Sequence, residues 1–142
     1  MKNMMIFLIL ILWLGPTGSY AASTKDKRMD EVLGAYLKIQ ESLANDSLEH
    51  VQIEAAKIAK HSSKKDLKLP AQALSHDTSL EAARSDFKRL SVAMNKWAKE
   101  VNPVNVDRVT CSMADATWLQ KRGDIKNPYY GKQMQSCGEV QK

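Results

Sequence analysis

The pattern of apolar residues changes its period at Asn102-Pro103, and this change constrains the fold more than any other feature of the chain. Before it, residues 79–101 carry apolar side chains at spacings of three and four, the period of an amphipathic helix. After it, β-branched residues in 104–111 partly alternate with polar ones, which favours a short strand. Proline ends the helix because it restrains the residue before it to extended conformations. We therefore expect a helical front part and a different, strand-containing tail (residues 104–142).

Two earlier segments also show the helical period. One covers residues 30–44, and the other ends near Lys60. Between them, Asp46 and Glu49 have the spacing of a capping box, which predicts the start of the second helix. The apolar stripes of the three expected helices consist of Val32, Leu33, Tyr36, Leu37 and Leu43 in the first, Val51, Ala55, Ile58 and Ala59 in the second, and Leu80, Ala83, Phe87, Leu90, Met94, Trp97 and Val101 in the third.

The third helix has the clearest beginning, because Thr78 or Ser79 offers an N-cap. Residues 61–77 contain Pro70, and their periodicity is too weak to assign an element. The fold class that we predict is mainly α. It is an antiparallel bundle of about three helices with a short, turn-rich C-terminal region that contains small β elements.

The tail contains several signals for turns. A strand that ends at Cys111 is expected to pair with residues 118–120 across a turn at residues 114–117. Asn127-Pro128 is expected to cap and open a single helical turn. The tail is therefore predicted to be irregular and to fold back on itself.

The N-terminus has the layout of a secretory signal peptide. Lys2 precedes an apolar run of eleven residues, glycine and proline follow, and Ser19-Tyr20-Ala21 places small residues at the −3 and −1 positions. The run is shorter than the 18 or so residues of a membrane span. We predict cleavage after Ala21 and no stable membrane anchor afterwards. The mature protein is then exported, and it is periplasmic in a Gram-negative source.

The composition of the mature chain fits one domain of residues 22–142 and disfavours a nucleic-acid partner. Removing Lys2 with the signal peptide lowers the formal net charge from +5 to +4. Four lysines between residues 60 and 68 cluster in sequence, but no aromatic residues interleave with them. This arrangement is typical of a solvated loop.

The only two cysteines each have a methionine at short spacing: Cys111 with Met113, and Cys137 with Met134. On a strand the first pair would share a face, and in a helical turn the second pair would do the same. Thiolate and thioether sulfur select Cu(I) and related soft ions over hard cations. His76 and Trp118 are possible accessory residues, since imidazole binds copper and an indole ring attracts a cation.

A disulfide is the alternative, because two cysteines in an exported domain commonly form a structural bridge. A bridge between Cys111 and Cys137 would close a loop of about 26 residues and stabilise the fold by about 3 kcal/mol. Oxidation would remove the thiolates and reduction would restore them. The two states therefore remain open alternatives at the level of the sequence.

No catalytic arrangement is recognisable in the sequence. It lacks a Cys-x-x-Cys pair, a glycine-rich phosphate loop, a Gly-x-Ser-x-Gly elbow and a His-Glu-x-x-His motif. Asp115 is close to Cys111, but the sequence nominates no base that would activate the thiol. We therefore expect that the protein is not an enzyme.

The tail contains a longer pattern around its cysteines, which consists of Cys111-Ser112-Met113-Ala114-Asp115, Trp118-Leu119, Ile125-Lys126-Asn127-Pro128-Tyr129-Tyr130-Gly131-Lys132-Gln133-Met134 and Cys137-Gly138-Glu139-Val140. This pattern resembles the DUF3347 family, whose members are separate exported proteins or domains fused to periplasmic adaptor subunits of heavy-metal efflux systems. The helical front of the mature chain is also similar to the beginning of that family.

The resemblance implies a domain of helical-hairpin type, with a helical part at about residues 26–102 and a metal-binding part at about residues 104–140. Cys111, Met113, Met134 and Cys137 match the sulfur positions of the family, whereas Trp118, Asn127, Pro128, Tyr129, Tyr130 and Gly131 match its structural frame. The family often has proline where this chain has Ser112, and this departure loosens the backbone at the expected site.

These observations lead to one functional hypothesis and one alternative. The hypothesis is an exported protein that binds Cu(I) or Ag(I) and either buffers the ion or delivers it to an efflux system, with an efflux adaptor subunit as the expected partner. The alternative is a disulfide-stapled helical interaction module of an efflux or envelope complex that binds no metal.

Overall fold

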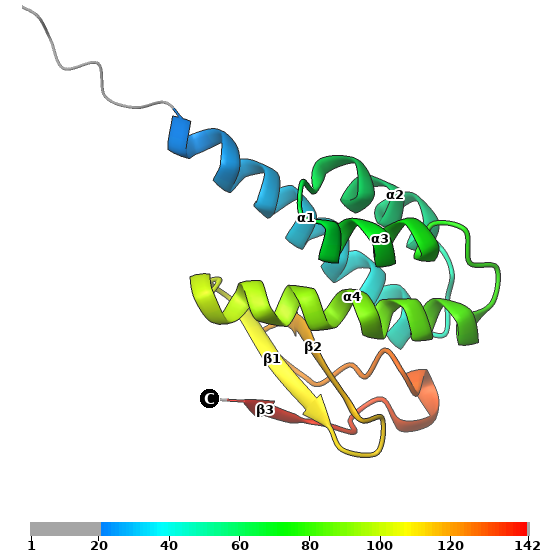
Figure 1. Cartoon of the computed structure of the whole chain (residues 1–142). Coiled ribbons are helices and arrows are strands. Elements are labelled where there is room, and N and C mark those ends of the chain that lie inside the picture. Colours follow the sequence, from blue (N-terminus) through cyan, green and yellow to red (C-terminus); the bar gives the residue numbers. More distant parts are fainter. Residues whose placement is uncertain (1–20, 142) are drawn as a thin grey trace, which may run out of the picture.

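The structure is a computed structural model that describes residues 21–141, with side chains from residue 27 onward. The predicted signal peptide lies outside these residues except for Ala21. The described part is mainly helical and has one small antiparallel sheet (Figure 1). Its elements are α1 (Ala21–Ala44), α2 (Val51–His61), α3 (Lys65–Leu74), α4 (Leu80–Val101), β1 (Val106–Cys111), β2 (Ala116–Lys121), the 3-10 helix η1 (Gly131–Met134) and β3 (Glu139–Gln141).

Helix α4 separates the two parts of the molecule. Figure 1 shows α3 on one side of α4 and the sheet on the other side. Along α4, the residues of the predicted stripe are buried from Ala83 to Trp97, whereas Val101 at its end is 51% exposed. Ser79 is the N-cap, and its Oγ accepts a hydrogen bond from Ala82 N at 3.2 Å. None of the helices in the described part is long and apolar enough to cross a bilayer.

The predicted number of about three helices is too low, because residues 61–77 contain α3. Pro70 lies inside this helix and removes one backbone hydrogen bond. Leu67, Ala71 and Leu74 nevertheless occur at spacings of four and three, and all three are buried against the neighbouring helices. Burial of this apolar face outweighs the unfavourable effect of Pro70 on the helix. The proline and the weak periodicity of residues 61–77 were therefore misleading signs against a helix.

The predicted capping box at Asp46 and Glu49 is also absent from the described structure. Helix α2 begins at Val51, four residues later than the box would place it, and its N-cap His50 has a left-handed backbone with φ 66°. No side chain caps this helix with a hydrogen bond. The Asp46 carboxylate instead contacts α4 and the tail, which leaves it unable to cap α2.

Tyr36 connects the helices to the sheet. Its ring is fully buried and stacks on Phe87 of α4 with 4.8 Å between the ring centroids. Its hydroxyl lies 2.6 Å from Ser91 Oγ and accepts a hydrogen bond from Leu119 N of β2 at 3.2 Å. Burial raises the pKa of Tyr36, so the phenol remains protonated and keeps these contacts.

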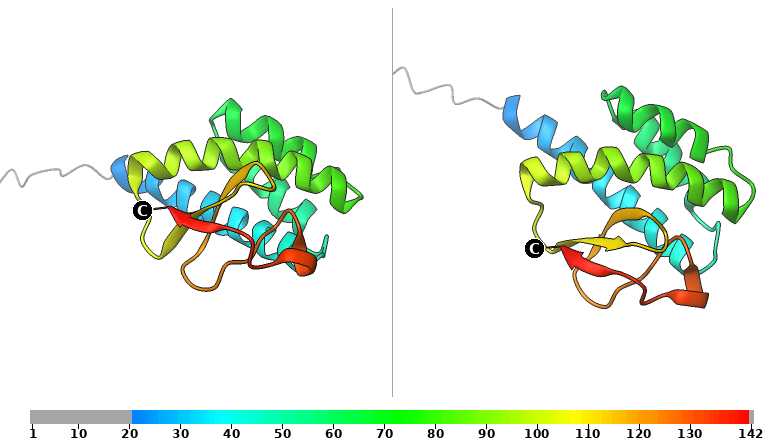
Figure 2. Two further views of the ribbon diagram at one scale, coloured as in Figure 1. Left: turned by 90° about the horizontal axis from the view of Figure 1, so that it is seen from below. Right: turned by 60° about the horizontal axis from the view of Figure 1, so that its bottom comes forward.

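The sheet has the strand order β2-β1-β3, and Figure 2 shows β1 between its two neighbours. The predicted hairpin is confirmed, with Val109 paired to Trp118, although its turn covers residues 112–115. One face of the sheet packs on α4, and segment 122–138 crosses the other face. Strand β3 was not predicted, because three residues are too few to show an alternating pattern.

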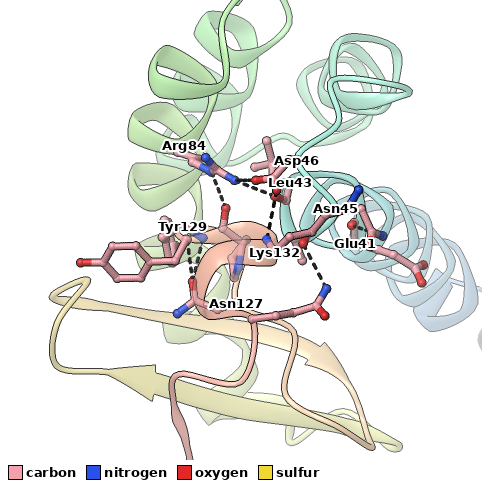
Figure 3. Close-up of polar contacts among 12 residues, drawn as sticks. Glu41, Leu43, Asn45, Asp46, Arg84, Asn127, Tyr129 and Lys132 are labelled. Carbon is pink, nitrogen blue, oxygen red and sulfur yellow. Dashed lines mark hydrogen bonds and ion pairs between the residues drawn. The ribbon is translucent and has the colours of Figure 1, made fainter.

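Asp46 joins the end of α1, the start of α4 and the tail (Figure 3). Its two carboxylate oxygens accept hydrogen bonds from Arg84 Nη2 at 2.6 Å and from Lys132 N at 3.0 Å. Arg84 also donates to the backbone oxygens of Leu43 and Pro128, at 3.0 and 2.8 Å. The hydrogen bond with Arg84 is the main cause that holds the pKa of Asp46 below its usual value, and the bond with Lys132 adds to it.

Gly131→Ala is expected to lower the free energy of unfolding by about 2–4 kcal/mol. The added Cβ atom would lie 1.8 Å from Asp46 Oδ1, and the glycine has φ +55°, a conformation that strains other residues. Urea denaturation measures this loss.

Gly34→Ala is the matched control for the same experiment. Gly34 lies inside α1 with nothing within 4 Å of its added Cβ atom, so this change is expected to stabilise the protein by about 0.5–1 kcal/mol. Equal effects of the two substitutions would contradict the close approach of Gly131 to Asp46.

Candidate functional site

The structure brings together the two cysteines, which the sequence separates by 26 positions. Cys111 ends β1 and is only 1% exposed, whereas Cys137 precedes β3 and is half-buried. Strand β3 pairs antiparallel with β1, with Thr110 opposite Glu139. This register carries Cys137 back to the end of β1, where its thiol hydrogen-bonds to the sulfur of Cys111.

The two sulfurs differ in their acidity. Burial raises the pKa of Cys111, but hydrogen bonds from Cys137, the backbone N–H groups of Ala114 and Met113, and Asn127 outweigh burial, and the net effect lowers this pKa. The hydrogen bond to Cys111 raises the pKa of Cys137, and burial adds to that increase. Cys111 is therefore the preferred thiolate, and Cys137 is the thiol that donates to it.

The turn after Cys111 is held from two sides. Residues 112–115 reverse the chain, with Asp115 in a left-handed conformation at φ 45°. Lys88 Nζ of α4 donates to Ala114 O at 3.0 Å, and the Tyr130 hydroxyl donates to Met113 O at 3.0 Å. The bond to Met113 O fixes the peptide group that carries the Ala114 N–H, which donates to the Cys111 sulfur, and the bond to Ala114 O holds the next peptide group of the turn. They restrain the backbone of the turn next to Cys111.

Asn127 organises the site, a role that the sequence indicated only as a cap. Its side chain is fully buried. Its Oδ1 accepts hydrogen bonds from Tyr129 N at 2.8 Å and Tyr130 N at 3.1 Å, so the predicted capping of a turn is confirmed. Its Nδ2 donates to Cys137 O at 2.8 Å, and the same side chain hydrogen-bonds to Cys111. One amide thus positions both cysteines.

Gly138 allows the chain to pass closely over the core beside Cys137. It has φ +154°, and an added Cβ atom would lie 2.7 Å from Val109 Cγ1 and 3.0 Å from Trp118 Cη2. A larger residue would push this backbone away from the sheet. Nothing in the sequence indicated that Trp118 forms the surface below this glycine.

The two methionines of the predicted four-sulfur site contact the cysteines through backbone atoms. Met113 N donates to the Cys111 sulfur, and Cys137 N donates to Met134 O at 3.1 Å. The side chain of Met113 is 62% exposed, and Met134 is half-buried at the end of η1. The structure therefore assembles the two thiols, while convergence of the thioethers stays a prediction.

The two accessory residues occupy other environments. His76 is exposed in the loop between α3 and α4, and Figure 1 shows this loop reaching α4 from the side opposite the sheet. Trp118 is fully buried, its Nε1 donates to Gln120 Oε1 at 3.2 Å, and its ring meets Tyr129 edge to face. Trp118 is thus a core residue below the site.

Within residues 27–141, no group of three or more His, Cys, Asp or Glu side chains could hold a metal ion. A metal at the two thiols would need further ligands from methionine or from a partner. No family model, curated protein or solved structure matches this chain.

In the reduced protein, the Cys111 thiolate is expected to form at a lower pH than an ordinary thiolate, as followed by its ultraviolet absorbance. Cys137→Ser retains a hydroxyl that can donate to the Cys111 sulfur, so the low midpoint should persist. Cys137→Ala removes this donor, and the midpoint should rise.

Substitution of Cys111, with titration of Cys137, is the second arm of the experiment. In Cys111→Ala, the pKa of Cys137 should fall back toward that of an ordinary thiol, because the main cause of its increase is gone. Equal midpoints for Cys137→Ser and Cys137→Ala would contradict the hydrogen bond between the two side chains.

Proposed function

We propose that this protein is an exported carrier of Cu(I) or Ag(I) that holds the ion between Cys111 and Cys137. The observation that carries the proposal is the hydrogen bond between these two sulfurs, which come from opposite ends of the tail. In this proposal, Met113 and Met134 are additional ligands of the ion.

The protonation of the pair suits the binding of a soft cation. A cysteine must be a thiolate to bind a metal, and the hydrogen bonds around Cys111 favour that form. The proton on Cys137 would leave as the ion takes its place, so binding should become tighter as the pH rises. The same backbone and amide donors would then orient the metal-bound sulfur of Cys111.

The donor set favours Cu(I) and Ag(I) over harder ions. Within residues 27–141, the two thiols have no third His, Cys, Asp or Glu beside them, which would leave a zinc ion short of protein ligands. Thioether sulfur completes the coordination of soft ions much better than that of hard ones. The exposed side chain of Met113 is free to move onto an ion at the thiols.

Delivery to an efflux system is supported by the sequence. The predicted signal peptide supports an exported location, and the resemblance of the tail to DUF3347 supports an efflux adaptor as the recipient of the ion. A site with one half-buried thiol and one exposed thioether suits transfer, because incoming ligands can replace outgoing ones in steps.

Reduced protein is expected to compete for Cu(I) against a colorimetric chelator, and either Cys111→Ser or Cys137→Ser should abolish this competition. Met113→Leu and Met134→Leu keep the shape of the side chain but remove the thioether. Each should weaken binding by about tenfold, which corresponds to about 1.4 kcal/mol.

Met29→Leu is the matched control, because Met29 is a partly buried thioether of α1 outside the tail. It should leave the affinity for Cu(I) unchanged. The carrier proposal fails if the reduced wild-type protein does not compete, or if the cysteine variants compete as well as the wild type.

The disulfide-stapled interaction module is the second candidate, and the same contact supports it. Exchange with the disulfide of an oxidising partner would join the adjacent sulfurs directly, and the partner would take up the two electrons and the Cys137 proton as its disulfide opens to two thiol groups. The bridge would close a loop of about 26 residues and stabilise the folded state by about 3 kcal/mol.

Alkylation separates the two candidates in the protein as it exists in the cell. For the carrier, we expect both cysteines to be labelled when cells are lysed in excess N-ethylmaleimide without a reductant. Absence of label, together with a loss of about 3 kcal/mol of unfolding free energy after reduction, would identify the stapled module instead.

A further inference from the structure

A groove of about 640 Å³ lies between α4 and the hairpin of β1 and β2. Its wall on α4 carries Lys88, Lys96 and Lys99, and β1 contributes Arg108. Cys111 and Ser112 lie at its border, where the hairpin turns. The groove is therefore next to the dithiol but is formed by the face of the sheet that packs on α4.

The groove has an excess of positive charge. Of the described residues that line it, Asp115 alone carries a carboxylate, and it pairs with Lys88 at 3.5 Å. Within residues 27–141, no hydrogen bond or ion pair engages the side chains of Lys96, Lys99 or Arg108. Three cationic side chains thus remain available to an anionic ligand.

The groove also contains an unpartnered acceptor. Asn95 is only 8% exposed, and its Nδ2 donates to Ser91 O and Thr117 O, each at 2.8 Å. Its Oδ1 is buried and has no hydrogen-bond partner among the described residues. Because this oxygen is buried, it is closed to a ligand in the groove, and Asn95 instead ties α4 to β2 through its two donated bonds.

The length of the groove indicates what kind of anion it takes. From Lys88 to Lys99, α4 rises by about 16 Å, which is the length of about five residues of extended peptide. A single small anion would fill only a small part of a groove of this length. No aromatic side chain lines the groove, so it lacks the stacking platforms that bind single-stranded nucleic acids.

We propose that this groove binds an extended acidic segment of a partner protein. Carboxylates of the segment would pair with Lys96, Lys99 and Arg108. Val92, which is 71% exposed on α4, would contact an apolar side chain between the acidic ones. The inference is independent of whether the dithiol binds metal.

The test uses the full mature protein and a fluorescein-labelled peptide with the sequence Glu-Asp-Glu-Val-Glu-Asp, followed by fluorescence anisotropy. The wild type is expected to bind it, and binding should weaken as salt is added. Replacing Lys96, Lys99 and Arg108 together by glutamine should weaken binding by about tenfold or more, since each surface pair contributes up to about 1 kcal/mol.

A matched control removes the same amount of charge elsewhere. Lys60, Lys65 and Lys68 are exposed on the other side of the bundle, and replacing them by glutamine should leave binding unchanged. Replacing the three groove cations by glutamate should instead create binding to Lys-Arg-Lys-Val-Lys-Arg. The inference is overturned if the wild type does not bind, if both glutamine variants lose affinity equally, or if a thymidine hexanucleotide binds as tightly as the acidic peptide.

Discussion

The tail depends on the hydrogen bonds of one buried amide. Segment 122–138 crosses a face of the sheet with only one 3-10 turn, so its backbone groups cannot satisfy each other as they would in a helix. Asn127 accepts from two N–H groups at the start of this turn and donates to Cys137 O at its other end. The segment therefore closes into a loop around Asn127, and the position of Cys137 follows from that closure.

The same constraint determines the chemistry of the cysteines. Because β3 pairs with β1, the loop returns to the end of the strand that carries Cys111. Gly138 lets the chain pass directly over Trp118, and a tryptophan below the site excludes water from one side of the sulfurs. Hydrogen bonds then have a large effect on the acidity of Cys111, since few water molecules compete for its sulfur.

Much of the fold could be predicted where one sequence period dominates. Helix α4 and the β1–β2 hairpin follow directly from spacings of three to four and of two. Helix α3 was missed because its burial against other helices outweighs Pro70, and β3 because three residues show no period. The sequence predicted that Cys111 and Cys137 come together, but not the register of β3 that brings this about. The role of Asn127 could not be derived either, because it depends on contacts between residues far apart in sequence.

The long helical part does more than support the tail, because α4 also forms one wall of the groove. One face of α4 buries Phe87 and Leu90 in the core, while another face places lysines along the groove. Lys88 belongs to both regions, because it contacts the turn after Cys111 and also lines the groove. A partner segment in the groove would therefore reach the same turn that directs N–H groups at the Cys111 sulfur. Binding of a partner segment and access to the dithiol would then be coupled through α4. The tail alone could not provide this coupling.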